Sequence, residues 1–257
     1  MEKIMQRRRT KRISKSATMY IPIGALLIVV LTVLGVSSFL RIMVIEVEGT
    51  TRYTADDIIY ASGLSKGDNL LFLDTEGIEQ RIISAMPFVN SATISRVVPD
   101  GIIIEVEESA PIAAIYTRDG MIILDSGVRI LEIRGARVPG LIEVIGITPI
   151  DAEVGGQLRG EEARAVQYLR ELLRILEAEG MAEDVSDIDI SNLARIEFWY
   201  LDRFRVRLGE PNYLQEKINW ITSPGTIGQI NRDRGADAMG LLDVSNHIEF
   251  PRFTPTS

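Results

Sequence analysis

The order of apolar and polar positions divides the chain into one long apolar run and two regions of alternating pattern. Residues 16–40 carry no charge, and residues 21–40 read "IPIGALLIVVLTVLGVSSFL". A helix of 20 residues rises about 30 Å, roughly the hydrocarbon thickness of a bilayer. The pattern therefore predicts a transmembrane helix over residues 18–40, preceded by an arm over residues 1–17.

A cleaved signal peptide is the rival interpretation, because Gly35-Val36-Ser37 could serve as a small-x-small site. The apolar part of a signal peptide is usually about 7–15 residues long and is followed by a polar segment. This run is longer and has no such segment after it, which favours a retained anchor.

The first folded region, residues 41–109, predicts a β-α-α-β-β order. Ile45 and Val47 alternate with glutamates as in a strand with one buried face. Residues 54–57 (Thr-Ala-Asp-Asp) form a capping-box pattern for a first helix, which Gly63 ends. Asp74 or Thr75 caps a second helix, and Pro87 closes it. The strands 88–97 and 102–107 then flank a Pro-Asp-Gly turn.

The second region, residues 110–250, predicts a β-rich domain with two helices. Three short strands separated by Gly turns occupy residues 111–132, and a Pro/Gly-rich connection follows. An amphipathic helix covers residues 161–179. Three strands, a helix over residues 213–221 and a last strand complete the domain, before a tail over residues 251–257. The predicted fold class is α+β: an anchor, a β-α-α-β-β domain and a β-rich domain.

Charge is distributed asymmetrically along the chain. The formal net charge is -8, from 28 Lys and Arg against 36 Asp and Glu, yet the first 15 residues are strongly basic. By the positive-inside rule, this basic arm places the N-terminus in the cytoplasm and everything after Arg41 outside. The topology signal consists of Arg7, Arg8, Arg9, Lys11, Arg12 and Lys15. Affinity for anionic lipid explains such an arm better than nucleic-acid binding, since the outer body is acidic.

The sequence offers little catalytic chemistry. There is no cysteine, which excludes disulfides, thiolate metal sites and thiol nucleophiles, and the one histidine is His247. Asp187 and Asp189 alternate with Ile188 and Ile190, so they are better explained as the solvent face of a strand than as a catalytic pair. Phosphate-loop, calcium-loop and Gly-x-Ser-x-Gly patterns are missing from the sequence. We therefore expect a binding or scaffolding protein without catalytic residues, cofactor, metal, small-molecule substrate or nucleic acid.

Several stretches in their order resemble the FtsQ/DivIB family of bacterial cell-division proteins. They include "VIEVEGTTRYTADDIIYASGLSKGDNLLFLD", "MPFVNSATISRVVPDGIIIEVEESAPIA", "GMIILDSGVRILE", "VPGLIEV" and "GLLDVSN". The resemblance implies a POTRA domain, a β domain and a single-span anchor in the cell membrane at the division septum. It also implies a non-enzymatic scaffold that binds FtsL and FtsB/DivIC-type partners and helps control septal peptidoglycan synthesis.

In this family the C-terminal strand lies at a sheet edge that accepts a partner strand, because an open edge presents unpaired N–H and C=O groups. Carried over, the partner-binding edge is Leu241, Leu242, Asp243, Val244, Ser245, Asn246 and His247. Proline at Leu242 or Val244 is expected to remove main-chain donors from this edge. A second candidate edge in the POTRA domain is Phe88, Val89, Asn90, Ala92 and Thr93.

Two other classes of function remain open. A POTRA-type factor that handles polypeptides in secretion or membrane-protein assembly would use the same strand addition, but would normally carry a β-barrel or repeated POTRA units. A membrane-anchored wall hydrolase would need a nucleophile or metal cluster that the sequence does not suggest.

Overall fold

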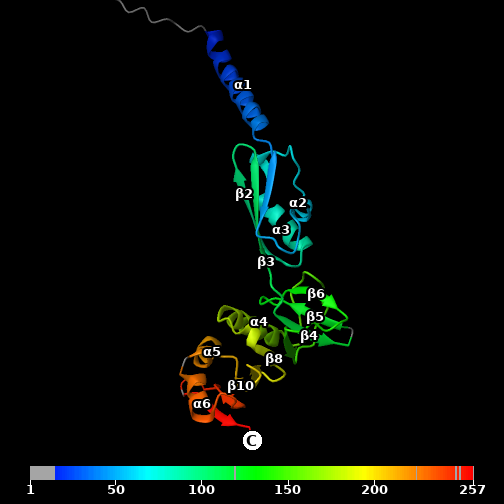
Figure 1. Cartoon of the computed structure of the whole chain (residues 1–257). Coiled ribbons are helices and arrows are strands. Elements are labelled where there is room, and N and C mark those ends of the chain that lie inside the picture. Colours follow the sequence, from blue (N-terminus) through cyan, green and yellow to red (C-terminus); the bar gives the residue numbers. More distant parts are fainter. Residues whose placement is uncertain (1–14, 119, 224, 247, 249, 257) are drawn as a thin grey trace, which may run out of the picture.

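The computed structural model describes residues 15–118, 120–223, 225–246, 248 and 250–256. A lone helix, a small lobe and a larger lobe follow one another along an elongated molecule, and the C-terminus lies at the end opposite the helix (Figure 1). The helix is α1 (Lys15–Phe39). Over the residues described, no helix has the length and hydropathy together that crossing a membrane requires. The predicted span therefore stays a prediction.

The first lobe has the predicted β-α-α-β-β order. Its elements are β1 (Val44–Glu48), α2 (Ala55–Ser62), a 3-10 turn (Leu70–Phe72), α3 (Thr75–Ala85), β2 (Val89–Val97) and β3 (Gly101–Glu108). The sheet order is β1-β3-β2, with β3 parallel to β1 and antiparallel to β2. The returning strand β3 is thus central, with β1 and β2 at the two edges.

Local capping fixes where the two helices of the first lobe begin. Thr54 accepts a hydrogen bond from the Asp57 N–H, and the Asp57 carboxylate accepts one from the Thr54 N–H at 3.0 Å, which confirms the capping box. Gly63 ends α2 with φ +70°, the left-handed region that suits glycine. Asp74 caps α3 by accepting from the Gly77 N–H, so Asp74 rather than Thr75 is the cap.

The core of the first lobe lies between the sheet and the two helices. Ile58 of α2 and Ile82 of α3 are fully buried, and so are Ile102 and Ile104 of β3. Glu105 and Glu107 alternate with these isoleucines and are exposed. The period-two pattern of β3 therefore separates a face packed on the helices from a face in solvent.

The second lobe is built on one nine-stranded sheet with the order β12-β11-β10-β9-β8-β7-β4-β5-β6. Its strands are β4 (Ala113–Thr117), β5 (Gly120–Leu124), β6 (Ile130–Arg134), β7 (Ile142–Ile145), β8 (Val185–Asp189), β9 (Ile196–Tyr200), β10 (Phe204–Gly209), β11 (Gly240–Asp243) and β12 (Arg252–Pro255). Its helices are α4 (Ala163–Ala178), α5 (Leu214–Thr222) and α6 (Thr226–Arg234), with a 3-10 turn at Ala182–Asp184. The α+β class is confirmed.

The predicted amphipathic helix is α4, and its apolar stripe is buried against the sheet. The buried side chains are Ala165, Val166, Leu169, Leu172, Leu173 and Leu176. They share one core with Ile188 and Phe198 of the sheet and with Ile218 of α5. Helical spacing alone was therefore enough to predict this face.

Three elements of the second lobe differ from prediction. The predicted Pro/Gly connection contains β7, which pairs in parallel with β4 and with β8 and so joins the two halves of the sheet. A third helix, α6, follows α5; with Ile230 as its one buried residue, it gives almost no apolar period. The predicted tail contains β12, which pairs antiparallel with β11.

The two lobes meet through Arg129, which is 8% exposed. Its guanidinium donates to the carbonyls of Val89 (2.5 Å) and Ile83 (2.5 Å) in the first lobe, and to that of Gly155 (3.0 Å) in the second. Phe88 completes the contact by packing in a cluster with Ala114, Met121, Ile123 and Leu131. One buried cation thus ties the end of α3 and the start of β2 to the second lobe.

Candidate functional site: the C-terminal edge of the large sheet

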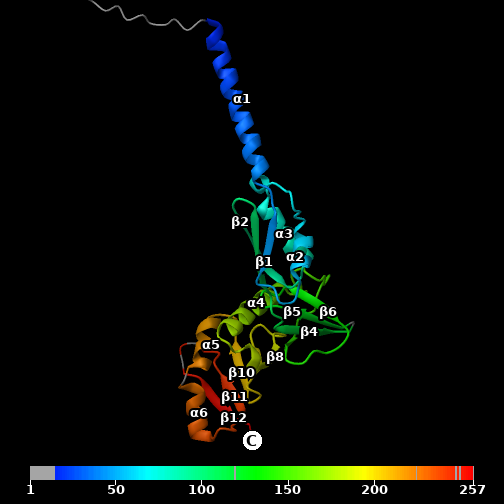
Figure 2. The same ribbon diagram turned by 45° about the horizontal axis from the view of Figure 1, so that its top comes forward.

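The predicted docking residues lie on β11 and just beyond it, at the end of the molecule far from α1 (Figures 1 and 2). Leu242 and Val244 point into the core with 0% and 1% exposure, whereas Leu241 and Asp243 are half-buried. Ser245 and Asn246 are exposed. His247 lies outside the described residues.

The expected open edge at β11 is wrong in one respect, because β12 covers it. β11 pairs in parallel with β10 on one side and antiparallel with β12 on the other. Figure 2 shows the three strands side by side next to α5 and α6. The outermost strand of the described sheet is therefore β12, in the segment predicted to be a C-terminal tail.

The backbone N–H and C=O groups of successive β11 residues point alternately toward β10 and toward β12. This alternation corrects the expected effect of proline at Leu242 or Val244. The Gly240 N–H donates to the Arg203 carbonyl (3.1 Å) and the Val244 N–H to the Arg207 carbonyl (3.0 Å), so even-numbered residues face β10. The Met239 carbonyl accepts from the Thr256 N–H (3.0 Å), so odd-numbered residues face β12. Proline at Leu242 or Val244 would therefore break the β10–β11 ladder; the edge donors belong to Leu241 and Asp243.

A turn fixes the chain where β11 ends. One Asp243 carboxylate oxygen, Oδ1, accepts from the Ser245 N–H (3.0 Å) and from the Ser245 hydroxyl (2.6 Å). Gly209 closes this corner: a Cβ there would lie 2.7 Å from that of Ser245. Only glycine, at its φ of +68°, allows these two segments of the chain to approach so closely.

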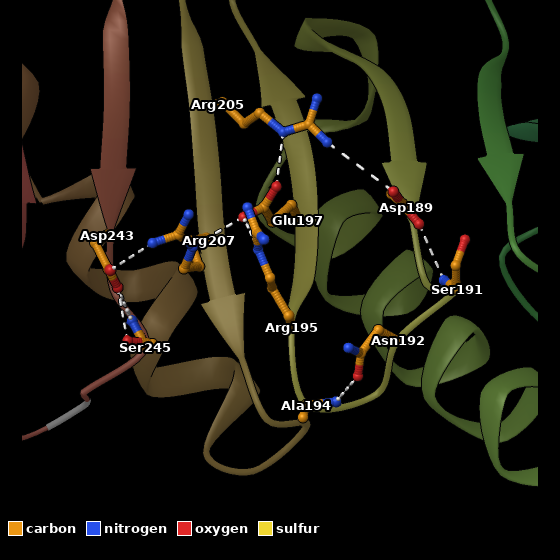
Figure 3. Close-up of polar contacts among 10 residues, drawn as sticks. All are labelled: Asp189, Ser191, Asn192, Ala194, Arg195, Glu197, Arg205, Arg207, Asp243 and Ser245. Atoms are coloured by element: carbon orange, nitrogen blue, oxygen red, sulfur yellow. Dashed lines mark hydrogen bonds and ion pairs between the residues drawn. The ribbon is translucent and has the colours of Figure 1, made fainter. Parts of the chain in front are cut away.

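A charged cluster lies next to this edge, on the face of the sheet away from the helices (Figure 3). Glu197 of β9, whose side chain is 6% exposed, accepts from Arg195 (2.9 Å), Arg205 (2.7 Å) and Arg207 (2.8 Å). Arg207 also reaches Asp243 of β11 at 3.3 Å. The cluster therefore links β9, β10 and β11 through their side chains, in addition to the backbone ladder.

The electrostatics of this cluster favour the ionised carboxylate. Burial by itself raises the pKa of Glu197, but the hydrogen bonds from the three arginines outweigh burial and lower that pKa from 4.5 to about 2. Burial also raises the pKa of Asp243, but the hydrogen bonds from Ser245 and the contact with Arg207 outweigh burial, so the pKa of Asp243 is lowered. At neutral pH both groups are charged, so this surface acts as a fixed pattern of ion pairs.

The two aspartates of β8 occupy the solvent side, as predicted. Ile188 and Ile190, which alternate with the aspartates, are fully buried, while Asp187 and Asp189 are half-buried. Burial raises the pKa of Asp187, and Asp189 lies 4.0 Å from Arg205. Their arrangement is that of an outer sheet face rather than of a carboxylate pair built for proton transfer.

The second candidate edge is only partly free. Within the described residues β2 pairs with β3 alone, so it is an edge strand as expected. Phe88 and Val89, however, belong to the contact between the lobes, and Ala92 is 5% exposed. Asn90 donates to Glu107 at 3.4 Å. Beyond Thr93, the Ile94 N–H donates to the Glu79 carboxylate (3.3 Å), so this part of the edge is also partly occupied.

Most of the basic arm lies outside the described residues. Arg7, Arg8, Arg9, Lys11 and Arg12 lie outside the described residues, and Lys15 is the first residue of α1. The topology signal therefore remains a prediction from sequence.

Sequence reasoning missed the Glu197 cluster and the Arg129 contact. The cluster left a signal: "RFRVR" places Arg205 and Arg207 on the same side of one strand, and the neighbouring strand carries a single glutamate, Glu197, which alternates with core-facing Ile196 and Phe198. Arg129 left none, because its partners are backbone carbonyls brought together only when the lobes meet.

The fold defines the class: a POTRA lobe of β-α-α-β-β order followed by a β-rich lobe built on one nine-stranded sheet. Residues 40–109 match the family model described as POTRA domain, FtsQ-type. The first lobe is therefore a POTRA domain of the FtsQ type.

Relatives extend the similarity beyond that domain. The chain is 32% identical over 131 residues to cell division protein FtsQ of Corynebacterium glutamicum, covering 49% of this chain and 58% of that protein. It is 26% identical over 209 residues to cell division protein DivIB of Clostridium acetobutylicum, covering 80% of each. With FtsQ of an Anaeromyxobacter species the figures are 28% over 185 residues, 71% of this chain and 61% of the relative.

The resemblance to the FtsQ/DivIB family is thus confirmed by the POTRA match and by relatives that are named as cell division proteins. The matches span under two thirds of the Corynebacterium and Anaeromyxobacter proteins and four fifths of the Clostridium protein. What these relatives do as whole proteins is therefore carried over below only as a proposal.

Proposed function

We propose that this chain is a single-span, non-enzymatic scaffold of the division machinery. Its outer lobes bind partners of the FtsL and FtsB/DivIC type, and the docking element is the C-terminal edge of the nine-stranded sheet. The observation that carries the proposal is the position of β11. It lies one strand from the end of the sheet, and within the described residues its outward donors at Leu241 and Asp243 are paired by the four-residue strand β12.

Strand addition supplies affinity in this proposal. A partner strand beside β11 would satisfy the N–H and C=O groups of Leu241 and Asp243, and its side chains would lie on the two sheet faces. On the outer face it would meet the ion pairs of Glu197, Arg207 and Asp243. That fixed charge pattern supports selection of a strand with complementary charge.

Membrane anchoring by α1 is part of the same proposal. Its support is the absence of charge from residues 16–40 and the 25-residue length of α1, about 37 Å at the usual helical rise. Large apolar side chains of α1 are exposed on several sides, among them Leu26, Leu27, Ile28, Val29 and Leu31. A helix apolar all round needs an apolar environment.

The basic arm sets the proposed orientation. With seven Lys and Arg before residue 16, the N-terminus lies in the cytoplasm and both lobes lie outside, at the division septum. In the elongated arrangement of Figure 1 the docking edge is then the part of the protein farthest from the membrane. It would lie on the side of the membrane where the septal wall is synthesised.

Site-specific photo-crosslinking in living cells tests the docking edge. A photo-reactive residue at Leu241 or Asp243 is expected to capture a small single-span, coiled-coil division protein, whereas the same residue at Ile133, an exposed position at the other end of the sheet, captures none. Equal capture from both positions would remove the edge as the docking site.

Depletion in cells tests the proposed role in division. Loss of the protein is expected to produce filamentous cells with unfinished septa. Normal division with a secretion defect would instead favour a polypeptide-handling factor, and reproducible cleavage of peptidoglycan fragments by the purified chain would favour a wall hydrolase.

A further inference from the structure

We propose that β12 is an internal substitute for the partner strand: it occupies the outer side of β11 in the resting protein and must leave before a partner strand can enter. This inference rests on the proposed docking edge and adds its regulation. The contacts of residues 250–256 carry it.

β12 pairs with the same backbone donors of β11 that a partner strand would need. The register pairs Leu241 with Thr254 and Asp243 with Arg252. The Thr256 N–H donates to the Met239 carbonyl, so the even residues of β12 face the odd residues of β11. With β12 in place, the outward backbone groups of β11 are already paired.

The outer side of β12 is itself a poor edge for strand addition. Because its even residues face β11, the backbone of Pro251, Phe253 and Pro255 faces outward. Proline has no N–H, so two of these three positions lack a donor and only Phe253 can give one. Natural sheets use proline in this way to blunt an edge. A partner strand therefore gains a full ladder only on β11.

Most side chains of β12 are exposed. Arg252, Thr254 and Pro255 are exposed, and only Phe253 is partly buried. The Phe253 ring packs edge-on against that of Phe204, with centroids 5.9 Å apart. By contrast, Leu242 of β11 is fully buried, so β12 contributes one partly buried ring at the margin of the core while β11 is part of the core itself.

The packing position of the Phe253 ring requires a glycine at residue 240. Gly240 lies beneath it, and a Cβ at that position would be 2.8 Å from the ring and 2.2 Å from the Thr254 carbonyl oxygen. A cavity of about 550 Å³ lies next to the same ring, lined by Trp220, Ile230 and Phe250 among others. The ring is thus fitted on one side and unsupported on the other, consistent with a strand that detaches.

The segment before β12 can act as its tether. Phe250 is 80% exposed, and its ring packs against Trp220 of α5 at 5.0 Å. This contact can hold the C-terminal segment near the sheet after β12 has left. Re-entry is then intramolecular, so β12 competes at a high effective concentration.

Occupancy by β12 lowers the apparent affinity for any incoming strand. If β12 is absent from β11 in about 1–10% of molecules, the apparent dissociation constant rises by about ten- to a hundredfold. Removing β12 should restore the intrinsic affinity by the same factor.

The test uses the full chain in detergent micelles and a fluorescently labelled synthetic peptide with the sequence of residues 250–257. A chain truncated after Phe250 should bind this peptide at least tenfold more tightly than the intact chain. Phe253→Ala, which keeps the length, should lie between the two, and Thr254→Ala, an exposed position, should match the intact chain. Equal affinity of the intact and truncated chains overturns the proposal.

Hydrogen exchange gives a second readout on the same proteins. The amides of Leu241 and Asp243 should exchange at least tenfold faster in the truncated chain, whereas those of Leu242 and Val244 should stay protected, which also shows that the variant is folded. Protection of Leu241 and Asp243 without β12 would overturn the proposal. Neither readout needs a division partner, so a failed partner crosslink and a failed self-complementation remain distinguishable.

Discussion

Substitution of Glu197 by glutamine removes the charge at the centre of the cluster beside the docking edge. The carboxylate accepts from Arg195, Arg205 and Arg207, whose side chains are 61%, 37% and 28% exposed. Glutamine keeps the shape and one acceptor oxygen but turns an amide N–H group toward the guanidinium donors. The variant therefore leaves three arginines around a neutral group, with no change in packing volume.

The lowered pKa sets the size of the effect. A fall from 4.5 in the unfolded chain to about 2 in the folded protein corresponds to about 3 kcal/mol of stability at neutral pH. Water can reach the arginines after the substitution and recover part of this. We therefore expect Glu197→Gln to lower the free energy of unfolding by about 2–3 kcal/mol at pH 7.

The sign of the pH dependence follows from the depressed pKa. The stabilisation is fully present above the unfolded value of 4.5 and is lost as pH falls through the folded value of about 2. By that relation it should shrink from about 3 kcal/mol at pH 7 to about 1.5 kcal/mol at pH 3. The gap between the wild-type chain and Glu197→Gln should narrow accordingly.

Urea unfolding followed by tryptophan fluorescence measures this gap, because both tryptophans, Trp199 and Trp220, lie in the second lobe. Glu132→Gln is the matched control: Glu132 is 31% exposed and pairs with Arg134 alone among the salt bridges of the described residues, so it should cost under about 1 kcal/mol. A Glu197→Gln effect no larger than the control, or one that is the same at pH 3 and pH 7, would refute the reasoning.

Three further predictions concern the other contacts that hold the fold. Thr54→Ala should cost about 1 kcal/mol in urea unfolding through loss of the capping box, and an effect near zero would contradict the cap. Leu242→Ala should cost about 2–5 kcal/mol because the side chain is fully buried, whereas half-buried Leu241 should cost clearly less as alanine. Arg129→Met should speed amide exchange where the lobes meet, while Arg170→Met, whose hydrogen bonds stay within the second lobe, should not; equal rates would show that Arg129 does not hold the lobes.

Much of the fold was predictable from local patterns. The first lobe followed from the alternation in β1 and β3, the Thr54–Asp57 cap and the glycine that ends α2. The stripe of α4 and the inward isoleucines of β8 followed from periods of 3.6 and 2. These features depend on residues close in sequence, so the chain encodes them without reference to distant partners.

Tertiary structure decided the elements whose support comes from elsewhere in the chain. β7 is four residues long and becomes a strand because β4 and β8 provide ladders on both sides. α6 has one buried residue, so its sequence carries no helical period. Arg129 found its carbonyl partners only through the packing of one lobe on the other.

The docking edge is the clearest case in which sequence determined one part and tertiary structure the other. The sequence by itself determined that a strand lies near residue 241 and that the segment after it is rich in proline. Only the folded protein decided that this segment pairs with β11, because a strand is stabilised by the ladder of its neighbour rather than by its own residues. Its prolines, which argue against a central strand, are compatible with the outermost one.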